Sequence, residues 1–381
     1  MWNRFFPKEL YNYSRQMSKS SSTIDPKSEI NDLRQPGDFK GYSFSNFKNS
    51  EVKKSFRENM LKGKIEPACY WCAELLCAGH YMDVWESILH FVGKYIHLGN
   101  PKVIIYLERR FLIFRDIMTK GRYATELQLR NNDKIRKLFA EIISVLTYSN
   151  KKHSFEAIKI NREDEFDITQ MNEKLKAPSI HYAEGIMMKN DPKELLIAVN
   201  EFAYHISRDC KNMTIACYWF EWVVEFDNIC KKRKEPCYCD RRMNIPVENK
   251  FQCDIVWILW DCIFHYGNEM QNVFISSILK SLLELVCIKY TTASSKKRRY
   301  LFYFAIALLT EPVPTNIELI SNKESIQSAI DNIDEVYKQI KKNEITPNTD
   351  YLFANIEKQN NFEKSVKKME MLEKFDMFSE K

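Results

Sequence analysis

The sequence predicts an all-α protein that contains two related multi-helix units. Turn-forming residues are scarce, because the 381 residues include only 9 Gly and 12 Pro, whereas an all-β chain needs a turn signal about every 8–12 residues. Apolar residues recur at helical spacing instead; Val52, Phe56 and Met60, for example, fall at i, i+4 and i+8. The hydrophobic fraction of 45% and the aromatic fraction of 13% are typical of a folded globular chain.

The two units are predicted from a repeated string. Ala-Cys-Tyr-Trp occurs at 68–71 and again at 216–219. Trp and Cys are rare residues, so a chance second copy is unexpected in a chain of this length. Two further pairs of segments continue the correspondence, 83–85 with 254–257 and 136–139 with 299–302. We interpret the pattern as a tandem duplication of one helical unit, with one insertion and a later deletion.

Five parts follow one another along the chain. They are an N-terminal extended arm (1–43), helical unit 1 (44–150), a linker (151–184), helical unit 2 (185–312) and a C-terminal helical tail (313–381). The arm is rich in Ser and in Pro-containing breakers, which is why we expect it to be extended. The linker is polar and has no helical period, and a charged basic insertion (231–252) interrupts unit 2.

Breaker residues set the predicted helices of unit 1. Gly63 ends the helix that begins at Glu51, Pro67 stands in the first turn of the next helix, and Gly79 stops that helix. A sharp turn before Pro101 separates two further helices. Together with the apolar period, these signals predict helices over 51–62, 66–78, 82–97, 101–118 and 133–148.

Similar signals predict the helices of unit 2 and the tail. Asp191 with Pro192 is an N-cap followed by a first-turn proline. The helices are predicted over 191–207, 212–230, 253–266, 272–290 and 295–310, and two charged helices are predicted after 323. The first of these carries an apolar stripe that either packs on the body or forms a coiled coil with a partner. The stripe consists of Ile326, Ile330, Ile333, Val336 and Ile340.

Charge and cysteine content suggest where the protein acts. The net charge of +6 is mild and does not by itself indicate a nucleic-acid-binding protein. No stretch approaches 18 uncharged residues, so we expect no membrane association. The 11 Cys are an odd number and lie mostly in apolar helical stretches, as expected for buried thiols in a reducing compartment. We therefore expect an intracellular, cytoplasmic protein, located in the virus factory or virion if it is viral.

Residues 52–101 resemble a known helical domain. Lys54-Ser55 with Arg57, the segment 68–73, and the turn 98–101 match the domain that follows the ATPase core in replication-associated recombination ATPases of the RarA/MgsA type. That domain belongs to the same broad group as the collar helices of clamp loaders, and the resemblance implies an oligomerisation module. The chain has no Gly-x-x-x-x-Gly-Lys-Ser/Thr loop, so the nucleotide chemistry of that family is absent.

No motif in the sequence predicts catalysis. Cys237-x-Cys239 is the best metal candidate, but the spacing of one residue and the missing second pair favour an ordinary loop. The histidines are scattered, and no Cys/His pair or Gly-x-Ser-x-Gly elbow stands out. We therefore expect a protein that is not an enzyme and that holds no metal and no cofactor.

Three basic clusters are the functional lead. The last of them opens a predicted helix, where positive charge opposes the helix dipole at a cost of about 0.3–1 kcal/mol, which suggests phosphate contact. Tyr238 and Tyr300 lie beside the clusters and could stack on bases; a solvated basic face is the simpler interpretation. The candidate nucleic-acid-binding residues are Lys231, Lys232, Arg233, Lys234, Arg241, Arg242, Lys296, Lys297, Arg298 and Arg299.

The favoured hypothesis is a non-catalytic scaffold or assembly protein. The Lys/Asn/Ile-rich composition and duplicated layout resemble uncharacterised proteins of large DNA viruses. We expect the protein to form a homo-oligomer, to contact other viral or replication proteins, and to bind DNA or RNA in replication or genome handling. The alternative is a virion or virus-factory structural protein that acts through protein–protein contacts alone.

Overall fold

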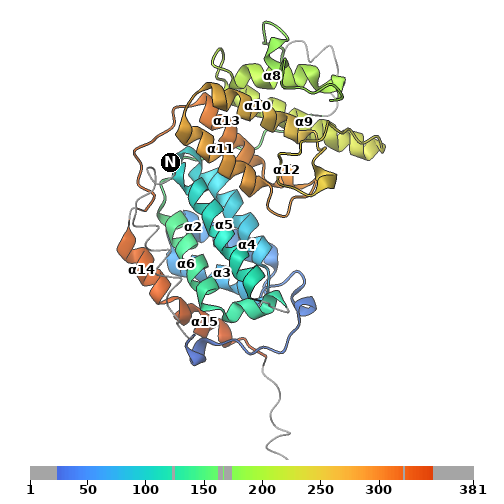
Figure 1. The fold of residues 1–381 in the computed structure, drawn as a ribbon. Helices are drawn as coiled ribbons and strands as arrows, with labels where there is room; N and C mark the ends of the chain where they lie inside the picture. Colours follow the sequence, from blue (N-terminus) through green and yellow to red (C-terminus); the bar gives the residue numbers. More distant parts are fainter. Residues whose placement is uncertain (1–23, 122–124, 162–165, 167–173, 321, 346–381) are drawn as a thin grey trace, which may run out of the picture.

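The computed structural model describes residues 24–121, 125–161, 166, 174–320 and 322–345. Within these ranges the secondary structure is helical and no β-strand occurs, so the predicted all-α class is confirmed. The helices form two adjacent groups that correspond to units 1 and 2, with the last two helices lying along unit 1 (Figure 1).

Unit 1 is a bundle whose central helix carries the first Ala-Cys-Tyr-Trp string. Its long helices are α2 (Asn49–Leu61), α3 (Ile65–Cys77), α4 (Tyr81–Phe91), α5 (Lys102–Lys120) and α6 (Asp133–Tyr148). α3 packs against α2, α4 and α6, because nearly every face of it is apolar. The helix predicted over 82–97 is wrong at its end: after Phe91 the chain winds into a π-helix, η4 (Val92–Ile96), and a 3-10 turn, η5 (His97–Gly99).

Unit 2 repeats the order of helices found in unit 1. Its helices are α8 (Leu196–Ile206), α9 (Met213–Arg233), α10 (Val256–Glu269), α11 (Val273–Val286), the short α12 (Ser294–Lys297) and α13 (Arg299–Thr310). α8 packs on α9 as α2 packs on α3, α13 packs on α9 as α6 packs on α3, and α10 contacts the first hairpin as α4 does. The duplication itself stays a prediction, which this order of packing supports. Trp219, Trp257 and Trp260 are fully buried in unit 2.

The two units meet along α5 and α11, and η4 of unit 1 packs against α13 of unit 2 (Figure 1). Gly93 permits this second contact, because a Cβ built there would lie 2.8 Å from the Cβ of Tyr300. The linker is hydrogen-bonded to both sides of the same contact. The N–H of Ser154 donates to the carbonyl of Lys94 at 2.8 Å, and the N–H of Ile158 donates to the hydroxyl of Tyr303 at 3.2 Å.

We expect Gly93→Ala to destabilise the protein by about 1–3 kcal/mol, because an added methyl group in a close-packed contact forces the backbone of α13 away from η4. Gly37→Ala is the matched control, since nothing lies within 4 Å of its Cβ position. Urea unfolding followed by tryptophan fluorescence measures both. Equal stability of the two variants would show that the contact between η4 and α13 is loose.

The tail packs on unit 1, as one of the two interpretations of its apolar stripe predicts, but its first predicted helix is divided in two. α14 (Lys323–Asp331) lies on α6 and α15 (Ile333–Lys341) lies on α3, with a break at Asn332 inside the predicted single helix. All five apolar residues of the stripe are buried in these contacts, so the stripe cannot form a coiled coil with a partner. The second predicted tail helix falls after 345, outside the described residues.

From residue 24 onward, the arm lies between unit 1 and the tail. Arg136 of α6 joins the three parts: its guanidinium is fully buried, donates to the Ser28 hydroxyl at 2.8 Å, and pairs with Asp334 at 2.7 Å. The ring of Tyr337 lies 3.9 Å from the same guanidinium carbon. Further along, the N–H of Leu33 donates to the carbonyl of Ile345 at 3.2 Å. The apolar start of the arm lies outside the described residues.

Candidate functional site

The first basic cluster lies on the C-terminal turn of α9, which ends three residues later than predicted. Lys231, Lys232 and Arg233 form the last turn, where positive charge is favourable for the helix dipole. Lys234 ends the helix in the left-handed region, with φ of +61°. Lys231 pairs with Asp227 one turn earlier, whereas Lys232, Arg233 and Lys234 are exposed and have no carboxylate within ion-pair distance among the described residues.

Arg242 does not belong to this surface, which corrects the prediction. Its side chain is buried; two of its nitrogens lie 2.5 and 2.6 Å from the carboxylate of Asp191, and its Nε lies 2.9 Å from Asp261. Burial opposes the charge of this guanidinium, but the hydrogen bonds to the two carboxylates prevail and raise its pKa. Arg242 therefore joins the basic insertion to α10 and to the segment that precedes η9 (Lys193–Leu195). Its neighbour Arg241 is exposed and donates to the neutral side chains of Gln252 and Asn249.

Two of the four residues in the 296–299 cluster, Arg298 and Arg299, also form ion pairs within the protein. Arg298 is buried, pairs with Glu86 of unit 1, and donates to the carbonyl of Val286 at 2.6 Å, where it caps the C-terminus of α11. Arg299 pairs with Glu221 of α9 at 3.2 Å. For these two residues the predicted phosphate contact is wrong. Their charge at the start of α13 is explained by the two carboxylates with which they pair and by the carbonyl to which Arg298 donates. Lys296 and Lys297 are exposed, with no carboxylate within ion-pair distance in the described ranges.

The remaining exposed cations form what we term the basic surface. Its members are Lys232, Arg233, Lys234, Arg241, Lys296 and Lys297. Arg299, the first residue of α13, lies just after α12 and pairs with Glu221 of α9, and Arg233 lies about 18 Å further along α9 at 1.5 Å per residue. Figure 1 draws the C-terminal end of α9 and α12 at the same side of unit 2. The surface therefore spans the length of about five base pairs of duplex DNA.

Of the two tyrosines predicted to stack on bases, one is available. Tyr238 is 55% exposed within the basic insertion. Tyr300 is buried, and its ring packs edge-on against His90 at 5.3 Å between centroids, so stacking by Tyr300 is ruled out.

The Cys237-x-Cys239 motif lies in an ordinary loop. The Cys239 thiol donates to the carbonyl of Asp254 at 3.3 Å, and burial raises the pKa of both thiols, to about 11 for Cys237 and about 12 for Cys239. Within the described ranges no group of three or more His, Cys, Asp or Glu side chains could hold a metal ion. In the same ranges every helix is too short or too polar to cross a membrane.

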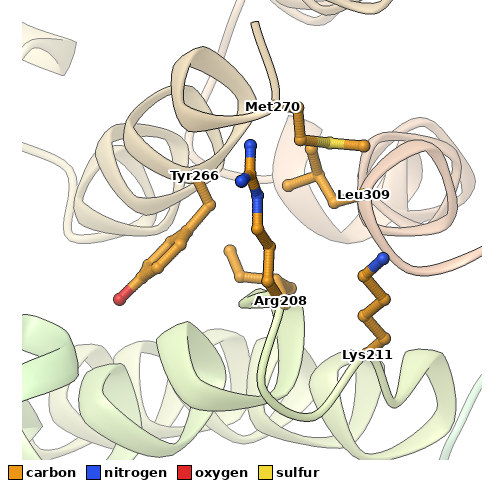
Figure 2. Close-up of a pocket in the computed structure, with 6 residues that line it drawn as sticks. Arg208, Lys211, Tyr266, Met270 and Leu309 are labelled. Carbon is orange, nitrogen blue, oxygen red and sulfur yellow. The ribbon is translucent and has the colours of Figure 1, made fainter.

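A hollow of about 240 Å³ lies between the loop after α8 and the C-terminal ends of α10 and α13. Figure 2 shows Arg208 and Lys211 rising from this loop into the hollow, with Tyr266 on one side and Met270 and Leu309 on the other. The guanidinium of Arg208 donates to the carbonyl of Glu269 and so caps the C-terminus of α10.

The same loop creates a contact that the sequence analysis missed. It brings the Cys210 thiol to 3.2 Å from Nδ1 of His205, whose Nε2 lies 3.4 Å from the carboxylate of Glu201. The signal in the sequence that could have indicated this contact is the i, i+4 spacing of Glu201 and His205, followed by Cys210 five residues later. Spacing alone does not reveal that the chain reverses between His205 and Cys210.

Comparisons of the chain with protein-family models, with curated proteins and with solved structures find no match. The resemblance of 52–101 to the helical domain of RarA/MgsA-type ATPases thus stays a prediction. In the structure those residues form α2, α3, α4, η4 and η5.

Proposed function

We propose that the protein is a helical scaffold that binds nucleic acid through the basic surface. The observation that carries the proposal is that five lysine and arginine side chains on α9 and α12 have no carboxylate partner among the described residues. A cation in an ion pair is already neutralised, whereas an unpaired cation gains free energy by binding phosphate and releasing counterions. Arg242, Arg298 and Arg299 are already paired with carboxylates, so we assign them a structural role and assign binding to the unpaired cations.

The shape of unit 2 favours a backbone-reading mode of binding. The start of α13, which directly follows α12, is held on α9 by the ion pair between Arg299 and Glu221, so the two groups of cations keep their spacing. Lysine and arginine contacts to phosphate position a protein but carry no sequence information. We therefore expect weak sequence preference. Tyr238, which is exposed in the basic insertion, supplies a ring on which an unpaired base could stack.

Self-association and a place in a DNA virus or a DNA-replication system are the narrower parts of the proposal. They rest on the resemblance of 52–101 to an oligomerising domain and on the composition. The alternative function, a virion or virus-factory structural protein, requires no nucleic-acid contact at all.

Replacing Lys296 and Lys297 together by Gln should weaken binding to a short DNA duplex roughly tenfold at moderate salt. It should also lower the slope of log K against log salt by about 2, because each lost phosphate contact removes a slope of about 0.9. Fluorescence anisotropy between about 50 and 200 mM salt measures both quantities.

The double replacement of Lys40 and Lys64 by Gln is the matched control, since these lysines are exposed on the arm and unit 1 and change the net charge equally. If the control weakens binding as much as the change on α12, binding is a property of net charge and not of the basic surface. If wild-type protein shows no salt-dependent binding, the structural-protein alternative stands. Light scattering on the same samples tests self-association.

A further inference from the structure

Three side chains at the end of α8 contact one another in series: Glu201, His205 and Cys210. Glu201 and His205 lie one turn apart on α8, both buried, and Cys210 returns to them through the loop 207–212. The thiol lies 3.2 Å from Nδ1 of His205, and Nε2 of the same ring lies 3.4 Å from the Glu201 carboxylate. The N–H of Asn212 donates to the carbonyl of His205 at 2.8 Å, which fixes the loop against the helix end.

The surroundings of Glu201 keep it ionised. Burial alone would raise the pKa of its carboxyl group, but the neighbouring His205 and the N–H groups of Lys176 and Ala177 outweigh burial and lower the pKa. These N–H groups donate to the carboxylate at 3.1 and 2.9 Å. No hydrogen bond joins Nε2 to the Glu201 carboxylate, but the negative charge at ion-pair distance favours the imidazole tautomer with hydrogen on Nε2. The lone pair of Nδ1 then faces the Cys210 thiol and can accept its proton.

Among the described cysteines, Cys210 is distinguished by its partner, the imidazole ring of His205. It is partly exposed, and the neighbouring Tyr204 has a pKa raised by partial burial and by the Cys210 sulfur. Cys230 and Cys237 are also partly exposed, but burial followed by neighbouring charged groups raises the pKa of both thiols. Those two cysteines lie in the same unit and serve as internal references.

We propose that Cys210, His205 and Glu201 form a nucleophilic thiol centre that accepts acyl groups from activated esters and thioesters. This goes beyond nucleic-acid binding and does not depend on it. A nucleophile within hydrogen-bond reach of a base, with the base oriented by a third group, is the arrangement that activates thiols in acyl transfer. Glu201 is a positioning residue, because it acts through His205.

The reaction balances without a further reagent. Nδ1 of His205 takes the thiol proton, the sulfur of Cys210 attacks the carbonyl carbon, and the bond from that carbon to the leaving oxygen or sulfur breaks. The leaving group takes the proton from Nδ1, and a thioester remains on Cys210. Water then attacks the thioester, which releases the carboxylic acid and restores the thiol.

The test uses the full-length wild-type protein and p-nitrophenyl acetate as the acyl donor. Peptide mass spectrometry follows the acetyl group on each cysteine over time, and absorbance follows released nitrophenolate. We expect acetylation of Cys210 to be at least about tenfold faster than that of Cys230 or Cys237, with a burst of about one equivalent of nitrophenolate. Equal rates at the three thiols would overturn the proposal, and this comparison needs no variant that could fail to fold.

Two substitutions test the roles of the partners. His205→Gln should slow acetylation of Cys210 by roughly 100-fold, the contribution typical of a general base. Glu201→Gln should slow it about tenfold while leaving the rates at Cys230 and Cys237 unchanged; a merely structural role would change all three thiols together. His265→Gln is the control, because His265 pairs with Glu269 at 3.3 Å on the exposed face of α10. An unchanged Cys210 rate in a folded His205→Gln protein would remove His205 as the base.

Discussion

Replacing Arg242 by Ala is expected to lower the free energy of unfolding by about 3–5 kcal/mol. The guanidinium is buried between two carboxylates, and its removal leaves Asp191 and Asp261 without their cation. Asp191 is itself buried, so its negative charge cannot be solvated in compensation. The loss should be larger than for any exposed cation of the basic surface, because surface ion pairs contribute about 0–1 kcal/mol.

The adjacent residue supplies the control. Arg241→Ala removes the same chemical group one position earlier, from an exposed side chain that donates only to neutral amides, and should cost less than about 1 kcal/mol. Denaturant unfolding of both variants, monitored by tryptophan fluorescence, gives the comparison. Similar midpoints for the two variants would mean that the buried ion network adds little to the stability of unit 2.

Lowering the pH from 7 to 4 is expected to cost about 3 kcal/mol of stability through His97 alone, at 1.36 kcal/mol per pKa unit. Burial, reinforced by Lys152, lowers the pKa of His97 from 6.5 to about 4 despite the opposing effect of Glu311. The ring is stacked on Phe304 of α13 at 4.9 Å between centroids, so a charged imidazolium would sit at the contact between the units.

The direction of the pH effect follows from the lowered pKa. The unfolded chain binds the proton first, near pH 6.5, whereas the folded protein resists protonation until about pH 4. Stability is therefore complete above about pH 6.5 and is lost as the pH falls from there to about 4. His90 adds to the loss in the same direction, because burial lowers its pKa to about 4 as well.

The difference between wild-type protein and His97→Gln isolates the contribution of this residue. Unfolding free energy measured against pH should fall less steeply for His97→Gln than for the wild-type protein. His181→Gln, which changes an exposed histidine in the linker, is the control. Parallel curves for all three proteins would contradict a neutral, buried His97 at the contact between the units.

Helix positions could be predicted because they depend on local pattern. The apolar period and the breakers Gly63, Gly79 and Pro101 bound α2, α3 and α5 to within a few residues. The π-helix after Phe91 could not be predicted in this way, because it depends on a tertiary contact, the close packing of Gly93 against Tyr300 of the other unit. The break at Asn332 likewise depends on the surfaces of α6 and α3 on which the tail lies.

The candidate site was predicted only in part, for a similar reason. A run of basic residues shows where charge is concentrated, but not which side chain points inward. Arg241 and Arg242 are adjacent, yet one is exposed and the other is buried against a carboxylate from a distant part of the chain. The pairing of Arg298 with Glu86 across the two units is equally invisible to spacing.

The position of Arg136 has a consequence for the order of folding during synthesis. Its partners Ser28 and Asp334 are separated by almost the whole described chain, and unit 2 lies between them in the sequence. Contacts of such long sequence separation form late, because a large loop must close first. Unit 2 can therefore complete its core on the ribosome while unit 1, although translated earlier, still exposes the faces of α3 and α6 that await α14 and α15. A ribosome that stalls before residue 323 would hold a finished second unit joined to an unfinished first one.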